Sequence, residues 1–154
     1  GITENHYARN NLAVLYHTMR KARVLALKRG QDILVCPLDG QICSSNWALP
    51  LSVFGDTNNN YQLDSGEVLY MQANNKLKHG YWQKKRSTQN YIKFNSLGHA
   101  FGSATTFLYC PSSNQAVYAK QLVINFQGRI RINTYLNDQG KAFPNIAPLA
   151  CHTL

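Results

Sequence analysis

The amino-acid sequence predicts an α+β fold in which one long N-terminal helix packs on antiparallel β-sheet. An apolar stripe with helical spacing covers the first part of the chain. After it, short β-prone segments are separated by turn residues. A helix followed by a run of strands is typical of the α+β class. The length of 154 residues, 44% of them hydrophobic, suits a single globular domain spanning residues 1–154.

The predicted helix runs from about residue 5 to residue 29. Its apolar stripe recurs at spacings of three and four and consists of Leu12, Leu15, Met19, Ala22 and Ala26. Lys28 and Arg29 place positive charge at the C-terminal end of the helix dipole, and Gly30 supplies the left-handed cap. The stripe is expected to pack on the rest of the domain, with most Arg and Lys side chains facing solvent.

Short strands are predicted along the rest of the chain. They cover residues 33–36, 43–48, 53–56, 67–72, 91–94, 105–110, 120–126 and 129–134. The segment 43–48 is the expected hairpin partner of 33–36, and Gln127-Gly128 forms a tight turn between the last two strands. Residues 135–154 carry Pro, Asn and Gly and are predicted to form an extended C-terminal tail.

The charge balance favours an anionic partner. Sixteen Lys and Arg stand against seven Asp and Glu, which gives a formal net charge of +9. Such an excess attracts polyanions, either nucleic acid or anionic lipid headgroups, although it also serves solubility alone. No run of 18 apolar residues and no signal peptide is present, so we expect this sequence to be a trimmed part of a longer precursor.

The four cysteines allow three pairings. Cys36 and Cys43 bracket a Pro-Leu-Asp-Gly turn, which would place their thiols across a hairpin. The remaining pair, Cys110 and Cys151, would tie down the C-terminal tail. We therefore predict the disulfides Cys36–Cys43 and Cys110–Cys151 and an oxidising compartment, against the alternative of four reduced core cysteines.

One loop has the spacing of a calcium site. Asp56, Asn58, Asn60, Asp64 and Glu67 match positions 1, 3, 5, 9 and 12 of a calcium-binding loop. Tyr61 stands where that loop requires glycine, and strands rather than helices are predicted on both sides. The alternative is an Asx-rich turn whose side chains bond their own backbone. We predict no metal here.

The sequence lacks a pattern for catalysis. The five histidines are scattered without metal-ligand spacing, and no nucleophile elbow or phosphate-binding loop occurs. Lone histidines are usually surface or satisfied core residues. We therefore predict no enzymatic activity and no cofactor.

Two basic clusters could bind a polyanion. Lys84-Lys85-Arg86 follows Tyr81-Trp82, so positive charge lies beside aromatic faces that can stack on bases, although a solvated loop is the favoured interpretation. The second cluster is Gly128-Arg129-Ile130-Arg131. Along a strand, Arg129 and Arg131 would point to the same face, about 7 Å apart. The guanidinium group of arginine can bind a phosphate through two parallel hydrogen bonds. The alternative is two arginines on a solvated face.

Taken together, the motifs resemble the FimT/GspH group of minor pilins and pseudopilins. The resembling segments are Ala-Leu-Lys-Arg-Gly at 26–30, 33–36, Asp39-Gly40, Trp47, Val53-Phe54-x-Asp56-x-Asn58, Gly66-Glu67-Val68-Leu69, Ile92-x-Phe94-x3-Gly98 and Gly128-Arg129-Ile130-Arg131. They span roughly residues 8 to 134.

The resemblance implies a pilin-like fold and a preceding apolar helix half that anchors the precursor in the inner membrane. It also implies assembly with other major and minor pilins in a filament outside the cell. FimT-like members with a Gly-Arg-x-Arg motif are associated with double-stranded DNA binding in natural transformation, a role that would fall here on Gly128, Arg129 and Arg131. Lys84, Lys85, Arg86 and Lys141 would contribute peripherally. GspH-like members serve type II secretion instead, and a structural pseudopilin or pilus-initiation subunit is therefore the alternative.

Overall fold

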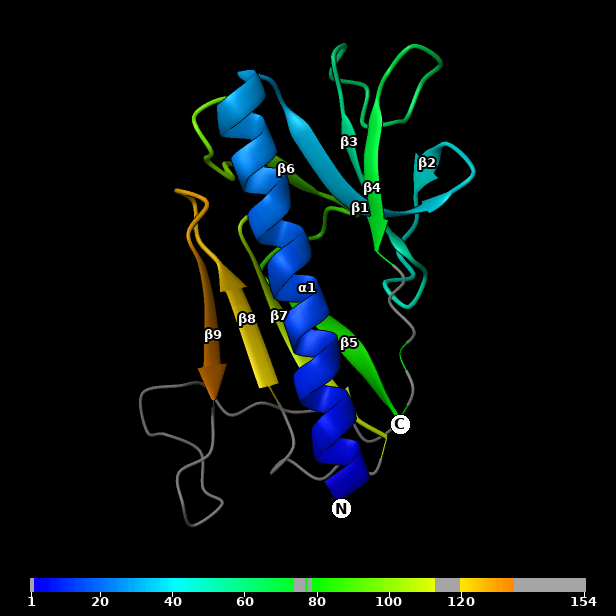
Figure 1. The fold of residues 1–154 in the computed structure, drawn as a ribbon, viewed down its shortest axis with the longest axis vertical. Helices are drawn as coiled ribbons and strands as arrows, with labels where there is room; N and C mark the ends of the chain where they lie inside the picture. Colours follow the sequence, from blue (N-terminus) through cyan, green and yellow to red (C-terminus); the bar gives the residue numbers. More distant parts are fainter. Residues whose placement is uncertain (1, 74–76, 78, 113–119, 135–154) are drawn as a thin grey trace.

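The fold is one helix packed on two antiparallel sheets, as predicted (Figure 1). The computed structural model describes residues 2–73, 77, 79–112 and 120–134. The helix α1 spans Ile2–Arg29. The strands are β1 (Ile33–Asp39), β2 (Ile42–Cys43), β3 (Leu51–Gly55), β4 (Leu69–Ala73), β5 (Gly80–Lys85), β6 (Ile92–Phe94), β7 (Thr105–Pro111), β8 (Lys120–Ile124) and β9 (Ile130–Thr134).

The two sheets divide the strands by sequence. The first sheet has the order β2-β1-β3-β4, with β6 also paired to β1, and the second has the order β5-β7-β8-β9. Every pairing is antiparallel. The helix contacts β1 and β6 of the first sheet and β7, β8 and β9 of the second. In Figure 1, α1 runs along the length of the molecule in front of both sheets, so it joins them into one domain.

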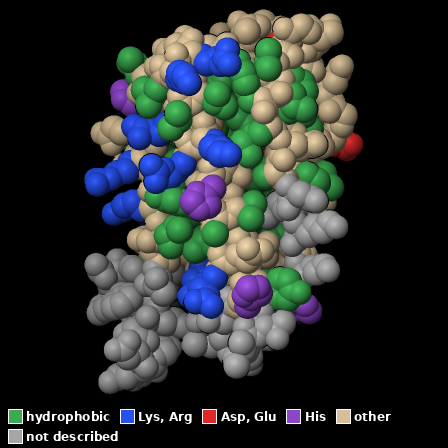
Figure 2. Space-filling view, viewed as in Figure 1, with side chains coloured by type: hydrophobic (Ala, Val, Ile, Leu, Met, Phe, Trp, Pro, Cys, Tyr) green, Lys and Arg blue, Asp and Glu red, His purple; other side chains and the backbone are tan. Residues whose placement is uncertain are grey.

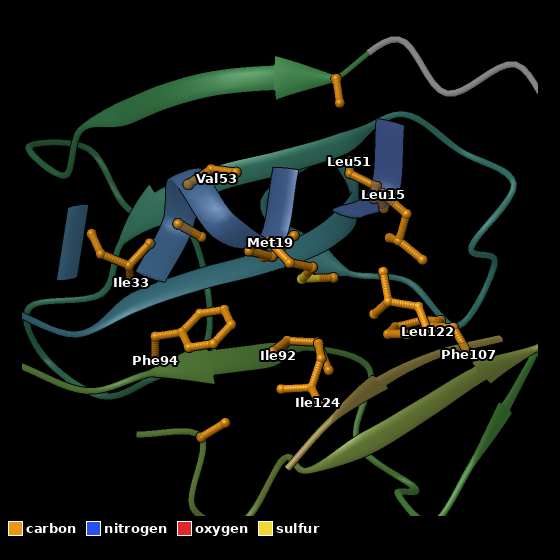
Figure 3. Packing of buried hydrophobic residues seen from close by; sticks show 14 of the residues in the cluster. Leu15, Met19, Ile33, Leu51, Val53, Ile92, Phe94, Phe107, Leu122 and Ile124 are labelled. Atoms are coloured by element: carbon orange, nitrogen blue, oxygen red, sulfur yellow. The ribbon is translucent and has the colours of Figure 1, made fainter. Parts of the chain in front are cut away.

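The apolar stripe of α1 lies in the core. Leu15, Met19, Ala22 and Ala26 are almost completely buried, as their spacing predicts. Figure 3 shows Leu15 and Met19 between residues of the two sheets, with Val53 on one side and Leu122 on the other. The helix ends where predicted, because Gly30 adopts a φ of 62° and its amide donates to Ala26 O at 2.9 Å.

Two strand predictions are wrong. The predicted strand 43–48 shrinks to the two-residue β2, because Asn46 Oδ1 accepts the Ala48 amide at 3.1 Å and forms a turn that competes with the ladder. Lys84 and Lys85, expected in a solvated loop, belong to β5, which pairs with β7 along its whole length. Trp82 packs against Phe107 in the core and so supports this strand.

The predicted Cys36–Cys43 disulfide is confirmed, with the two Cα atoms 5.5 Å apart. Cys43 pairs with Leu38 in the β1–β2 register, so the disulfide runs diagonally across the hairpin. Cys110, on β7, is also disulfide-bonded. Cys151 lies outside the described residues, as does the tail 135–154, so the Cys110–Cys151 pairing stays a prediction.

The loop with calcium spacing forms its turn without glycine. Tyr61 adopts a φ of 60°, and its ring stacks on Tyr91 with centroids 4.5 Å apart. The carboxylate of Asp56 accepts the amides of Asn60 and Tyr61 at 3.3 and 3.0 Å. Burial raises the pKa of Asp56, and its backbone hydrogen bonds oppose that change.

The other two carboxylates of this loop also have partners within it. Glu67 accepts the amides of Thr57 and Asp64 at 2.7 and 2.8 Å. Asp64 accepts the side-chain amide of Asn58 at 2.9 Å and also that of Asn60. Within the part of the chain that the structure describes, no group of three or more His, Cys, Asp or Glu side chains is arranged to hold a metal ion.

We predict that millimolar calcium leaves the melting temperature unchanged, because the loop carboxylates already accept hydrogen bonds from the loop. Thermal unfolding with calcium and with chelator measures this. Glu67→Gln should lower the melting temperature equally in both conditions, since it weakens two bonds to backbone amides. A rise with calcium that chelator reverses would contradict the prediction.

Candidate nucleic-acid interface

The Gly-Arg-Ile-Arg motif lies at the turn from β8 to β9. Gly128 N donates to Asn125 O at 2.9 Å and closes this turn. The side chain of Asn125 then accepts the Arg129 amide at 2.9 Å, while Asn125 N donates to Arg129 O at 3.1 Å. Arg129 immediately precedes β9 and Arg131 lies within it. Two hydrogen bonds to Asn125 therefore hold the backbone of Arg129, and the bond from Gly128 closes the turn before it.

Gly128 is required where this turn meets the rest of the domain. Its φ is 81°, and a Cβ placed on it would come within 1.8 Å of Gly98 O. Arg23, on α1, donates from Nε to the same Gly98 oxygen at 3.0 Å and from Nη2 to Gln127 O at 3.5 Å. We call these contacts of Arg23, Gly98 and Gly128 the glycine junction. It joins α1 to the β6–β7 loop and the β8–β9 turn.

The register of the second sheet sets the direction of Arg131. Ile130 pairs with Ile124 and Ile132 with Leu122, and those two partners are buried against α1. Arg131 pairs with Val123 and therefore points to the opposite, outer face of the sheet. Arg129, two residues earlier, falls on the same side by the alternation of an extended chain. Both arginines are exposed, and β9 is the edge strand of its sheet.

The second basic cluster is divided between the two faces. Lys85 pairs with Thr106, which pairs with Val123, which in turn pairs with Arg131. Lys85 and Arg131 thus lie in one row on the outer face, three strand steps or about 14 Å apart. Arg86 is exposed directly after β5, with a φ of 71°. Lys141 lies outside the described residues.

Lys84 points to the inner face instead. It pairs with Phe107, a core residue, and its ammonium lies 5.2 Å from the centroid of the Trp47 ring. Burial lowers the pKa of Lys84 to about 8. The sheet therefore separates Lys84 from the row that ends at Arg131.

The strands of the second sheet contain no acidic residue. The sequence has no Asp or Glu between Glu67 and Asp138, a stretch that includes every strand of the second sheet. Among the described residues, the only ion pair joins Lys93 to Asp32 at 3.3 Å. Figure 2 shows Lys and Arg gathered over the face of α1, mostly on the side of β8 and β9, with Asp and Glu visible only at the rim.

Two features of this site were not predicted from the sequence. Most Arg and Lys side chains of the helix are expected to face solvent, yet Arg23 bonds two backbone carbonyls of distant segments. No local pattern marks this, because its partners are 75 and 104 residues away. The second feature is the stretch without Asp or Glu between Glu67 and Asp138. The sequence shows it directly, and it could have indicated a surface that attracts anions.

We predict that Lys84 makes the domain less stable at neutral pH than at alkaline pH. Its pKa is about 8 when folded and near 10.5 when unfolded, so between these values the unfolded chain binds more protons. The free energy of unfolding therefore rises with pH across this window. Lys84→Met should raise the melting temperature at pH 7. The difference in melting temperature between this variant and the parent should shrink as the pH rises from 8 to 10.5.

Thermal unfolding followed by circular dichroism at several pH values tests this prediction. Lys85→Met is the matched control, since Lys85 is the exposed neighbour on the other face of β5. An equal pH dependence in both variants would show that burial of Lys84 is not the cause.

No described helix is apolar enough over a sufficient length to cross a membrane. A comparison with curated proteins gives no match. Among solved structures, the chain is similar to the type IV minor pilin FimU of Pseudomonas aeruginosa. In one crystal form the identity is 19% and the TM-score 0.66, over 94% of this chain and 98% of FimU. In a second crystal form the identity is 16% and the TM-score 0.61, over 90% and 96%.

The family comparison covers most of the domain. The family described as "Type II transport protein GspH" matches residues 13–128, from α1 to the glycine of the β8–β9 turn. Membership of this family implies association with other pilins in a filament. The fold and the sequence family agree: the chain belongs to the GspH family of pilin-like proteins, and its fold is that of a type IV minor pilin.

Proposed function

We propose that this minor pilin binds extracellular double-stranded DNA through Arg129 and Arg131 and serves DNA uptake in natural transformation. The observation that carries the proposal is a pair of exposed arginines at the edge strand β9, in a sheet whose strands contain no acidic residue. Within the GspH family, the proposal groups the chain with the FimT-like members. The precursor would be anchored in the inner membrane, and the mature protein would act as part of the pilus.

The spacing of the two arginines suits a phosphate backbone. Two residues along an extended chain separate them by about 7 Å, which is close to the phosphate step along one DNA strand. Each guanidinium can bind a phosphate through two parallel hydrogen bonds. Such contacts carry no sequence information, so binding would be nearly independent of DNA sequence.

The surroundings strengthen the local field. No described carboxylate forms an ion pair with either arginine, so neither charge is neutralised within the described part of the domain. Lys85 and Arg86 extend the positive charge to the opposite edge of the same sheet, and the net charge of +9 attracts DNA from a distance. We assign Lys84 a smaller part because it points to the inner face, and Lys141 a peripheral one.

The alternative is a structural subunit without a ligand, either in a type II secretion pseudopilus or in a pilus-initiation complex. The family description, which names a type II transport protein, favours it. The two functions separate in one experiment, because a purely structural subunit should not bind DNA at low salt.

We expect Arg129→Gln/Arg131→Gln to weaken DNA binding about tenfold or more and to leave the fold intact. Charge-assisted hydrogen bonds to phosphate are lost, while the glutamine stems keep part of the packing. The slope of log affinity against log salt should shrink by about 1 per arginine. Mobility-shift titrations at several salt concentrations, on two unrelated duplexes, measure both quantities.

Lys28→Gln/Arg29→Gln is the matched control, since it removes the same charge at the exposed C-terminal end of α1. Equal binding by the Arg129/Arg131 variant and the parent at moderate salt would place the site elsewhere. Absence of binding by the parent at low salt would favour the structural alternative.

We further expect Gly128→Ala to lower DNA affinity without changing any charge. The added Cβ would meet Gly98 O and force the turn that carries Arg129 away from the junction. Gly102→Ala is the control, because Gly102 has a φ of 80° but nothing within 4 Å of its Cβ position. Both variants carry a left-handed alanine, which costs roughly 1–2 kcal/mol of stability.

The comparison of affinities decides whether the junction positions the site. Only Gly128→Ala should lose affinity, and in the Arg129→Gln/Arg131→Gln background it should have no further effect. Mobility shifts with the parent, Gly128→Ala, Arg129→Gln/Arg131→Gln and the combined variant give this double-mutant cycle. Equal losses from Gly102→Ala and Gly128→Ala would assign the effect to general destabilisation.

A further inference from the structure

A groove of about 540 Å³ runs between α1 and β4, away from the Arg129/Arg131 site. Its walls combine two kinds of side chain. The cations are Arg20, Lys21 and Lys28, and the apolar groups are Val24, Leu25 and Met71. A volume of this size is within the range of sites that hold several side chains or a small ligand. We refer to it as the α1–β4 groove.

The cations of the groove have no acidic partner. The sequence has no Asp or Glu between Glu4 and Asp32, or between Glu67 and Asp138, so neither wall carries a carboxylate. The described part of the chain forms no ion pair with these cations. Among the described residues, the one side-chain hydrogen bond that these cations form goes from Arg20 to the hydroxyl of Tyr16, at 3.4 Å. The groove is therefore complementary to an acidic surface.

The apolar side chains distinguish the groove from a plain phosphate site. Val24 is 55% exposed and leaves hydrocarbon uncovered between the cations. Beyond the groove, Leu27 on α1 and Leu69 on β4 are also about half exposed. A DNA backbone gains little from exposed valine and leucine, whereas protein interfaces combine an apolar centre with a charged rim.

The groove and the proposed DNA site also lie on different faces. The groove is formed by α1, which packs on the inner face of the second sheet through the side of Leu122 and Ile124. Arg131 points to the outer face of that sheet. One straight duplex that contacts Arg131 is thus not expected to enter the groove.

We infer that the α1–β4 groove docks an acidic segment of another pilin subunit, with an apolar side chain of that segment against Val24 and Leu25. The inference rests on filament association, which family membership implies, and not on DNA binding. It adds the surface and the chemistry of the contact. A second copy of this chain is a poorer occupant, because its net charge of +9 repels a like molecule.

Photocrosslinking of the full-length protein in cells that assemble the filament tests the inference. A photoreactive residue at Val24 should form a product with another pilin subunit, identified by mass spectrometry of the linked peptide. The same residue at Ile42, which is 57% exposed on β2, should not form it. The linked peptide should carry Asp or Glu next to an apolar residue.

Charge reversal then tests the chemistry. Lys21→Glu/Lys28→Glu should reduce the Val24 product about tenfold, because like charges would face each other. Lys85→Glu/Arg86→Glu changes the net charge equally and should leave the product unchanged. Replacing the partner's acidic residues by lysine should restore the product with the Lys21/Lys28 variant.

Several outcomes would overturn the inference. These are a product that is insensitive to the charge reversal, a product only with a second copy of this chain, or no product with any pilin. A loss of DNA affinity in the Lys21/Lys28 variant as large as that of the Arg129/Arg131 variant would make the groove a nucleic-acid surface instead. Failure of DNA binding in the parent protein would leave the crosslinking result unaffected, so the two proposals fail separately.

Discussion

The glycine junction is the contact on which the arrangement of the domain most depends. The Nε of Arg23 bonds Gly98 O, and Gly128 packs against that same oxygen at a distance that admits no side chain. Through it α1 is tied to the loop that follows β6 in the first sheet and to the turn that joins β8 and β9 in the second. A backbone contact this close leaves little freedom, so the position of Arg129 follows from the packing of the helix and both sheets.

Charge is distributed in the molecule in a way that supports two separate surfaces. From Asp32 onward the structure describes five acidic residues. Four of them lie in or next to the turns around β2 and β3, and Asp32 pairs with Lys93. Within the part of the chain that the structure describes, the cations of the second sheet and of α1 form no ion pair. In the proposals above, the exposed edge at β9 meets DNA, while the α1–β4 groove meets a neighbouring subunit. The separation allows a filament subunit to bind a ligand while it is assembled.

Several elements could be predicted from the sequence because their cause is local. The helix follows from the spacing of Leu15 and Met19, and its end follows from Gly30. The Cys36–Cys43 disulfide follows from a hairpin of a few residues. The strand β5 was missed because its support, the packing of Trp82 on Phe107, comes from a strand more than 20 residues later. Trp47 and its neighbours were expected in a strand, but Asn46 forms a local turn instead.

The sequence by itself determined the fold class, the α1 stripe, the first disulfide and the identity of the basic motif, since each depends on residues close together in the chain or on composition. Only the tertiary structure decided which cations lie on the same face. It placed Arg131 and Lys85 in one row through three strand pairings, turned Lys84 to the opposite face, and brought Arg23 to a turn 104 residues away. Register and close backbone approach are set by the packing of the whole domain, and no local pattern encodes them.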